Sequence, residues 1–356
     1  MKRRSNELFR TILNGIMAQC ALLGALNGGT SAQELPPNET RHPIVIIGDT
    51  PYSSQDEAML AKALPIIADG SFPFVLHIGD YKAGKADCID AHDEGFSNLV
   101  KSLQPKPVFY TPGDNEWTDC DRNTNPKTNK PYSDLSRLDR VLSLFAQGTP
   151  SGAEAFAHRR QDRQTENATW THAGIRYLTI HVTGTNNGRD WVTGDPLEAA
   201  LKAVEARDEA NKDWLEDVFA LAAREKANAI VLATHGDMTD VGKKPVGIMC
   251  NDVALSDQHP CDAFVELRNI IRKLTIDFGK PVLLIHGDTE PFTLGQSFAG
   301  DEAPNLWRLN ATGDAGRTPF GIPFGVRDIT ILEFQLDKEI PFRARGLLTG
   351  KKPARR

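Results

Sequence analysis

The sequence predicts an α/β domain, and three observations support this class. Apolar runs of strand length alternate with longer stretches of helical periodicity, which is the pattern of sheets covered by helices. Five of the apolar runs end in a short polar segment that contains Gly and Asp. The 356 residues include 40% hydrophobic and 25% charged residues, which is typical of a globular protein with a large core. We therefore expect one large domain at residues 43–350.

The N-terminal segment has the pattern of a signal peptide at residues 1–32. Basic residues at positions 2–4 precede a mostly apolar run at 12–26, and small residues follow it. Polar side chains interrupt the apolar run, which favours cleavage over a membrane anchor. We predict that the mature chain begins near Gln33, that residues 33–42 form a linker, and that the protein is periplasmic or secreted, with no membrane span after cleavage.

The charge balance bears on the partners of the mature chain. Removing residues 1–32 removes four basic residues and one acidic residue, so the net charge changes from −6 to −9. An acidic protein is a poor match for nucleic acid or an anionic membrane, because both carry negative charge. We therefore expect neither of them as the main partner.

Four cysteines follow the predicted cleavage site. Cys88 follows Asp80 by eight residues and Cys120 follows Asp114 by six, so a Cys88–Cys120 bridge is natural if those strand ends are neighbours. Cys250 and Cys261 would then close a short loop of their own. A zinc site is the competing interpretation, but no CxxC spacing supports it.

The predicted strands divide into an inner set and a closing pair. The inner set covers residues 44–47, 74–78, 108–110, 176–182, 229–233 and 282–285. The closing pair, 329–336 and 342–348, is expected to be antiparallel, and the basic tail 351–356 is expected to be frayed.

The predicted helices lie between these strands. Ser53 or Ser54 is suited to cap a helix at 56–68, and Gly279 is suited to end the last one. Apolar residues at helical spacing indicate further helices at 96–103, 135–145, 197–221 and 264–278. Residues 183–189, which are rich in Gly and Asn, are expected to form a loop that either reaches the ligand pocket or, as we favour, is a surface turn.

Carboxylates and imidazoles follow the inner strands. In an open α/β sheet, residues just past the carboxyl ends of the strands line the ligand crevice, so we expect these side chains to converge. They are Asp49, Asp80, Asp114, His235, His286 and Asp288. Oxygen and imidazole ligands suit Mn, Fe, Zn or Mg, and six of them are enough for two ions. Two metal ions with a shared carboxylate can activate a hydroxide for attack on phosphorus, so the pattern favours a phosphoesterase.

The order of these motifs resembles the calcineurin-like metallophosphoesterase superfamily over residues 44–290. The family pattern is Asp-x-His, Gly-Asp, Gly-Asn-His-Glu, a His, and Gly-His-x-His, each after a strand. This resemblance implies a four-layer α/β/β/α sandwich. It also implies that Asp80 bridges two metals and that His235 and His286 bind the second one.

The chain departs from the family pattern in three motifs. The third motif is GDNE in place of GNHE, so Asp114 occupies a metal-binding Asn position and Asn115 occupies the position of the catalytic His. The first motif lacks its His, although Tyr52 stands one residue further on. The fifth ends in Asp288, so the first metal site would hold Asp49, Asp80 and Asp288, with Tyr52 as a further candidate, and would be an all-oxygen site. We predict Asn115, Asp80 and Tyr52 as the catalytic residues.

We predict an exported metal-dependent phosphoric ester hydrolase that uses a metal-activated hydroxide on a small phosphoester. The alternative is a non-catalytic protein that keeps the fold and binds a metal or a phosphorylated ligand, because the replaced His is the usual proton donor. An esterase with Thr50 as the nucleophile is a third hypothesis, and it would require insensitivity to chelators.

Overall fold

The computed structural model describes residues 42–190, 192–240, 246–250, 261–298 and 301–355. The chain divides into residues 1–36 and 37–356, and all described residues belong to the second part. The predicted signal peptide and all of the predicted linker except His42 lie outside the described residues. No helix in the described part combines the length and hydropathy needed to cross a membrane.

The first sheet contains three parallel strands in the order of the chain: β1 (Ile44–Ile47), β2 (Val75–His77) and β3 (Val108–Tyr110). Two antiparallel strands, β15 (Thr330–Phe334) and β16 (Phe342–Gly346), extend the sheet beyond β1. The predicted closing pair is therefore confirmed. Because β1, β2 and β3 are parallel, the loops that follow them leave the same edge of the sheet.

The second sheet has eight strands around a parallel centre. Their order is β17 (Ala354–Arg355), β11 (Thr293–Gly295), β12 (Leu306–Asn310), β10 (Val282–His286), β9 (Ala229–Ala233), β8 (Ile175–Thr179), β7 (Ala168–His172) and β6 (Arg159–Arg160). Strands β8, β9, β10 and β12 are parallel to their neighbours in this centre. The ends of β9 and β10 therefore lie together.

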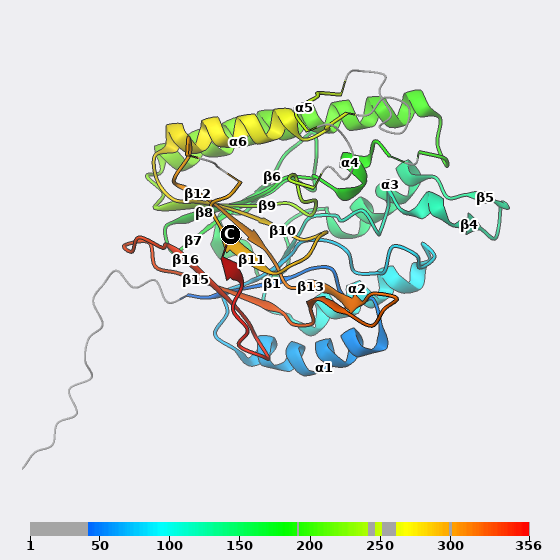
Figure 1. Cartoon of the computed structure of the whole chain (residues 1–356), viewed down its shortest axis with the longest axis horizontal. Coiled ribbons are helices and arrows are strands. Elements are labelled where there is room, and N and C mark those ends of the chain that lie inside the picture. The colour runs from blue at the N-terminus through cyan, green and yellow to red at the C-terminus, as the bar shows by residue number, and fades with distance from the viewer. Residues whose placement is uncertain (1–41, 191, 241–245, 251–260, 299–300, 356) are drawn as a thin grey trace, which may run out of the picture. The chain divides into compact units, whose positions relative to one another are not determined.

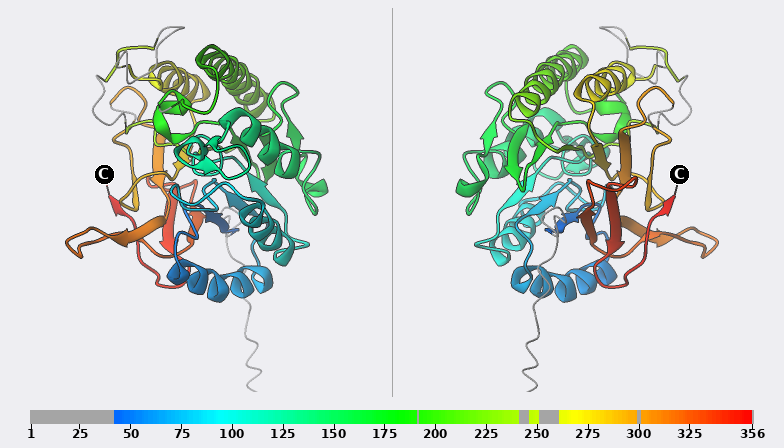
Figure 2. Two further views of the ribbon diagram at one scale, coloured as in Figure 1. Left: turned by 90° about the vertical axis from the view of Figure 1, so that its right-hand side faces the viewer. Right: turned by 90° about the vertical axis from the view of Figure 1, so that its left-hand side faces the viewer.

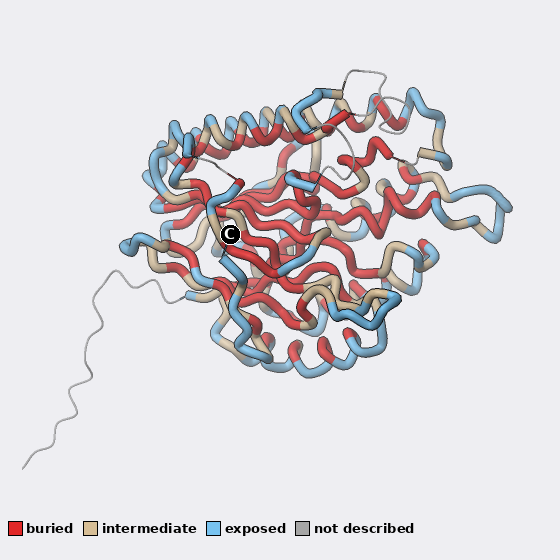
Figure 3. Tube along the Cα trace, in the orientation of Figure 1, coloured by how far each residue is buried: buried red, intermediate tan, exposed pale blue. Residues whose placement is uncertain are grey.

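The two sheets face each other across an apolar core, and helices cover their outer faces (Figures 1 and 2). Alternate side chains of β1 separate accordingly: Ile44 and Ile46 enter the core between the sheets, whereas Val45 and Ile47 pack toward the helices. Helices α1 (Ser54–Asp69), α2 (Asp90–Ser102) and α3 (Asp134–Phe145) share the core on the first sheet, and α5 (Leu197–Arg224) and α6 (Val265–Phe278) share that on the second. The expected α/β/β/α sandwich is confirmed, with its buried strands at the centre (Figure 3).

The helix ends follow the chemistry expected from the sequence. Ser53 is the N-cap of α1, and its hydroxyl oxygen accepts a hydrogen bond from the backbone N–H of Asp56 at 3.3 Å. Gly279 ends α6 in the left-handed conformation, with φ of 69°.

Short elements complete the described chain. They are η1 (Cys120–Arg122), β4 (Thr124–Asn125), β5 (Lys130–Pro131), η2 (Glu154–Phe156), α4 (Gly184–Gly188), β13 (Gly313–Arg317) and β14 (Pro323–Val326). Strands β13 and β14 form a two-stranded hairpin of their own.

Both predicted disulfides are present. The Cα atoms of Cys88 and Cys120 lie 5.7 Å apart, and those of Cys250 and Cys261 lie 5.0 Å apart. The first bridge joins the segments that follow β2 and β3, as expected for neighbouring strands.

Two local expectations were wrong. Residues 183–189 are not a surface turn, since Asn187 is completely buried and Arg189 is 5% exposed. The basic tail is not frayed, because Ala354 and Arg355 pair with Thr293 and Leu294 as strand β17. In both cases contacts with distant parts of the chain determine a conformation that local composition does not.

Candidate metal centre

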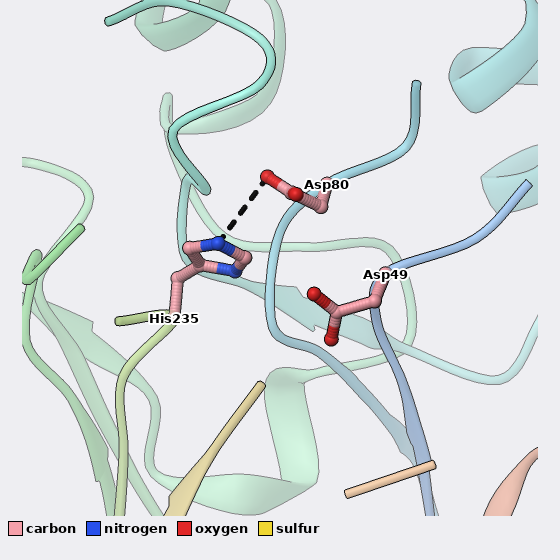
Figure 4. A group of neighbouring side chains, drawn as sticks. All are labelled: Asp49, Asp80 and His235. Carbon is pink, nitrogen blue, oxygen red and sulfur yellow. Dashed lines mark ion pairs between the residues drawn. The ribbon is translucent and has the colours of Figure 1, made fainter. Parts of the chain in front are cut away.

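Two groups of potential metal ligands lie at the carboxyl ends of the parallel strands. One group contains Asp49, Asp80 and His235, and the other contains Asp114, His235 and Asp288. Within each group the ligand atoms lie within 4.8 Å of one another. Figure 4 shows the first group, with the three side chains directed toward one another from three different loops. The predicted convergence of strand ends from both sheets is thus present in the structure.

His235 stands at the centre of these carboxylates. Its Nε2 lies 3.2 Å from Oδ1 of Asp114, 3.3 Å from Oδ1 of Asp80 and 3.8 Å from Oδ1 of Asp288. Its Nδ1 lies 2.8 Å from the carbonyl oxygen of Ile78, and a carbonyl only accepts, so Nδ1 carries a hydrogen. A neutral ring would therefore present the lone pair of Nε2 to the centre, as a metal ligand must.

The carboxylates at the centre are short of compensating charge. Burial raises the pKa of Asp49 to about 6. Burial also raises the pKa of Asp288 well above its ordinary value, and the charge of Asp114 adds to this. Burial alone would lower the pKa of His235, but the charges of Asp80 and Asp114 outweigh it and raise that pKa. A set of buried oxygen ligands with excess negative charge fits divalent cations.

The three predicted catalytic residues meet at Asp80. The Tyr52 hydroxyl donates to Oδ2 of Asp80 at 2.5 Å, and the backbone N–H of Asn115 donates to Oδ1 at 3.1 Å. The Asn115 amide donates to Oδ2 of Asp80 and, at 3.0 Å, to the Tyr52 hydroxyl. Both oxygens of the Asp80 carboxylate are therefore held in place.

Glu116 supports this arrangement through the backbone. Its Oε2 accepts from the backbone N–H of Asp80 at 3.0 Å, and its Oε1 accepts from Gly113 and from the Tyr110 hydroxyl at 2.8 Å each. Glu116 is completely buried, so its carboxylate is satisfied by these donors within the protein. The last residue of the GDNE motif thus fixes the backbone at Asp80, the carboxylate of the second motif.

The backbone takes an uncommon conformation at three of the candidate ligands. Asp49, Asp80 and Asp288 have φ values of 52°, 60° and 64°, in the left-handed region. A side chain on Gly113 would overlap the Asp80 carboxylate, and one on Gly287 would overlap that of Asp49. Glycine at these two positions lets the loops approach the carboxylates closely.

A comparison with protein families agrees with this geometry. The model of the calcineurin-like phosphoesterases matches residues 42–289. The chain belongs to this family. Membership, together with the ligand groups, supports metal-dependent phosphoester hydrolysis as its general activity.

Solved structures similar to this phosphoesterase include two proteins of low identity. A dimetal phosphatase from Danio rerio is 12% identical, with 85% of this chain and 96% of that chain covered and a TM-score of 0.45. The protein TT1561 of Thermus thermophilus is 13% identical, with 86% of this chain and 99% of that chain covered and a TM-score of 0.39. A comparison with curated proteins gave no match.

The two groups of candidate ligands differ from the division that the resemblance implies. Asp288 joins Asp114 and His235, whereas the resemblance placed it with Asp49 and Asp80. Its backbone N–H nevertheless donates to Oδ1 of Asp49 at 2.9 Å, so Asp288 lies beside both groups.

His286 lies outside both groups. Its Nδ1 lies 2.8 Å from the carbonyl oxygen of Gly287, and its Nε2 lies 3.8 Å from Oδ1 of Asp237. Asp237 Oδ1 is also bonded by the backbone N–H of Thr239 at 2.8 Å and by Arg308 at 3.2 Å. The buried Nε2 of His286 has no hydrogen-bond partner among the residues that the structure describes, and a ring nitrogen in this state suits a ligand. Metal binding by His286 stays a prediction.

Thr185, in the loop at residues 183–189, supports the centre, and this role was not predicted for it. The hydroxyl of Thr185 lies 3.1 Å from Oδ2 of Asp114 and 3.2 Å from Oδ1 of Asp119, so it connects the two carboxylates. Thr185, Asn186 and Asn187 are all left-handed, with φ between 51° and 59°. Successive Asn residues next to Gly tolerate this conformation, and they are the signal in the sequence for such a turn.

Proposed function

We propose that the protein is an exported, metal-dependent phosphoric ester hydrolase that acts on a small phosphoester, with two divalent cations drawn from Mn, Fe, Zn and Mg. The observation that supports this most strongly is the meeting of Asp49, Asp80, Asp114, His235 and Asp288 from five strand ends. Each comes from a different loop, so only the folded chain brings them together.

The donor chemistry supports assigning these side chains as ligands. Four carboxylates offer more oxygen atoms than their protein partners use, and Nε2 of His235 faces three of them. We assign Asp80 as the ligand shared between the ions, because a carboxylate has two oxygens to offer, its Oδ1 lies 3.3 Å from Nε2 of His235, the residue common to both ligand groups, and it is fixed by Tyr52 and Asn115. His286 is proposed as a further ligand on the basis of its unpaired nitrogen.

Divalent cations at such a site activate water as the nucleophile and offset the charge that develops on a phosphoryl group. The chain supplies the remaining functions. The Asn115 amide is a hydrogen-bond donor that can orient an ester oxygen, but it cannot transfer a proton. The Tyr52 hydroxyl, 3.0 Å from that amide, is a neutral donor at the same position. We propose that Tyr52 and Asn115 together orient the ester oxygen of the substrate beside Asp80.

One observation favours a second candidate, a non-catalytic binding protein. The Asn115 amide occupies the position of the family's imidazole and is already bonded to Tyr52 and Asp80. Such an arrangement holds a ligand without donating a proton to a leaving group.

The two candidates differ in turnover. The purified chain is stripped of metal, reloaded with each of the four metals, and assayed with p-nitrophenyl phosphate and bis-p-nitrophenyl phosphate. We expect turnover that is lost with chelator and lost in Asp80→Asn. Tight metal binding without hydrolysis of either ester would support the binding protein.

Export has a separate test. The intact mass of the protein recovered from the secreting cell should correspond to a chain that begins near Gln33. A mass that retains Met1 would contradict export by a cleaved signal peptide.

A further inference from the structure

A pocket of about 620 Å³ lies beside the candidate metal centre. One wall is the start of α1, with Tyr52, Ser54 and Gln55. The opposite wall is the β13–β14 hairpin, with Arg317 and Phe324. A volume of this size is within the range of small-molecule sites and far exceeds a phosphate ion.

The pocket adjoins the metal centre, because two residues of its lining also contact candidate ligands. Tyr52 lines the pocket while its hydroxyl donates to Asp80. Asp314, on the hairpin, lines the pocket while its backbone N–H donates to the carbonyl oxygen of Asp49 at 3.1 Å. The space between α1 and the hairpin is therefore next to the position at which a phosphoryl group would be held, which is where the organic group of a phosphoester has to lie.

The walls are fixed to each other by a buried carboxylate. Asp56, which is 3% exposed, accepts from the backbone N–H of Tyr52 at 3.1 Å and from the Ser53 hydroxyl at 2.7 Å. Its other oxygen accepts from Nε of Arg327 at 2.6 Å, and Nη2 of Arg327 donates to the carbonyl oxygen of Ala315 at 2.8 Å. These bonds tie the hairpin to α1, so the pocket exists before any ligand arrives and little ordering cost remains for binding.

The lining suits a polar ring better than a second anion. Its two carboxylates, Asp56 and Asp314, balance its two guanidinium groups, Arg317 and Arg327, and Arg327 is already paired with Asp56. The one phenyl ring is that of Phe324, which packs against the backbone of Gly316 across the hairpin. A partly buried aromatic face among hydroxyl, amide and carboxylate groups favours a planar ring that carries hydrogen-bonding substituents.

We propose that this pocket binds the organic group of the substrate, and that this group is a planar, hydrogen-bonding ring of about nucleoside size, stacked on Phe324. The proposal rests on the proposed function in that it places the phosphoryl group at the metal centre. It adds the chemical class of the ester, which the metal ligands do not specify.

The test compares two probes that share a phosphoryl group and differ in the organic group. Binding of adenosine 5′-monophosphate and of glycerol 3-phosphate to the metal-loaded protein is measured by titration calorimetry. We expect the first to bind more tightly in the wild type, and Phe324→Ala to weaken it about tenfold, as loss of one base–aromatic stack does, while binding of glycerol 3-phosphate is unchanged. Equal affinities of the wild type for the two probes, or equal effects of Phe324→Ala on both, would overturn the proposal.

Phe320→Ala is the matched control. Phe320 belongs to the loop of the same hairpin, but it is 90% exposed and does not line the pocket. Its replacement should leave both affinities unchanged, and a loss equal to that of Phe324→Ala would mean that the hairpin as a whole, and not the ring in the pocket, is responsible.

A second measurement needs no variant. Adenosine, which lacks the phosphoryl group, should compete with adenosine 5′-monophosphate for binding to the wild-type protein. An absence of competition would contradict the proposal that the pocket binds the organic group. Turnover separates this proposal from the proposed function. Tight binding of adenosine 5′-monophosphate without hydrolysis would contradict the proposed hydrolase activity but not the role of the pocket. Hydrolysis of both probes with no effect of Phe324→Ala would contradict the role of the pocket but not the hydrolase activity.

Discussion

The Cys88–Cys120 bridge connects the two loops that carry Asp80 and Asp114, so its removal should affect stability and metal binding together. The perturbation is the double variant Cys88→Ala/Cys120→Ala. Alanine is chosen because both positions are buried, at 6% and 0% exposure, and because it removes the sulfur atoms without adding a hydroxyl, which the carbonyl oxygen of Glu116 beside Cys120 could accept from.

The magnitude follows from the length of chain that the bridge closes. With a sequence separation of 32, the loop-closure relation gives a loss of about 3.7 kcal/mol in the free energy of unfolding. The Cys250–Cys261 bridge, with a separation of 11, gives about 2.8 kcal/mol by the same relation. Unfolding entropy near 2.1 cal/mol/K per residue converts the larger loss into a fall in melting temperature of about 5 °C for this chain.

The assay measures unfolding in denaturant and metal affinity by titration calorimetry, and Cys250→Ala/Cys261→Ala serves as the matched control. Both double variants should lose stability, the first by more. Only the first should lose metal affinity, because only that bridge joins the segments behind two candidate ligands. Equal metal affinity in the wild type and the first variant would refute the coupling, and a larger stability loss in the control would refute the loop-closure reasoning.

Four further substitutions have expected outcomes. Asp80→Asn should weaken binding of both metal ions in calorimetry, because its carboxylate is the proposed shared ligand. His235→Gln should mainly weaken one, because Nδ1 is bonded to Ile78 and the single lone pair of Nε2 binds one ion although both groups include it; equal small effects would contradict a two-metal centre. Asn115→His should narrow the gap between rapid hydrolysis of aryl phosphoesters and slow hydrolysis of alkyl ones, measured across leaving-group pKa values, because an imidazole can donate the proton that an amide cannot; a flat dependence in the wild type would mean that another acid serves. Burial lowers the pKa of His77 from 6.5 to about 3, so its neutral form stabilises the fold above pH 6.5 and this stability is lost as the pH falls toward 3. Between pH 7 and pH 5 the wild type should therefore lose about 2 kcal/mol more unfolding free energy than His77→Leu, and parallel losses would refute this assignment.

The sequence predicts most of the central parallel strands of both sheets, because a strand buried on both faces leaves a short continuous apolar run. It does not predict β7, β11 or β12 of the second sheet. The expected bounds of β1, β3 and β9 are those of the structure. The meeting of Asp49 and Asp80 follows from the same reasoning, since residues just past parallel strands share one edge of the sheet. His235 follows β9 of the second sheet, and the packing of the two sheets brings it to these carboxylates.

The parts that the sequence does not predict depend on contacts with distant residues. The turn at Thr185 is left-handed and buried because Arg207 and Asp208 of α5 bond Asn187 within it, at 2.6 and 2.7 Å. Strand β17 has a short, basic sequence without periodicity, and it forms only because β11 presents an open edge. The hairpin that walls the pocket is positioned by Arg327 reaching Asp56, which lies 271 residues away in the chain.

The left-handed backbone at Asp49, Asp80 and Asp288 lowers the stability of the fold at the residues that are proposed to bind metal. Each of these residues costs about 1 kcal/mol or more relative to glycine in the same conformation, and each also adds a buried charge. Glycine at any of the three would relieve both costs and delete a ligand. Laboratory evolution of this protein for heat resistance in metal-free medium should therefore dismantle the centre first, while the same selection in the presence of metal should preserve it.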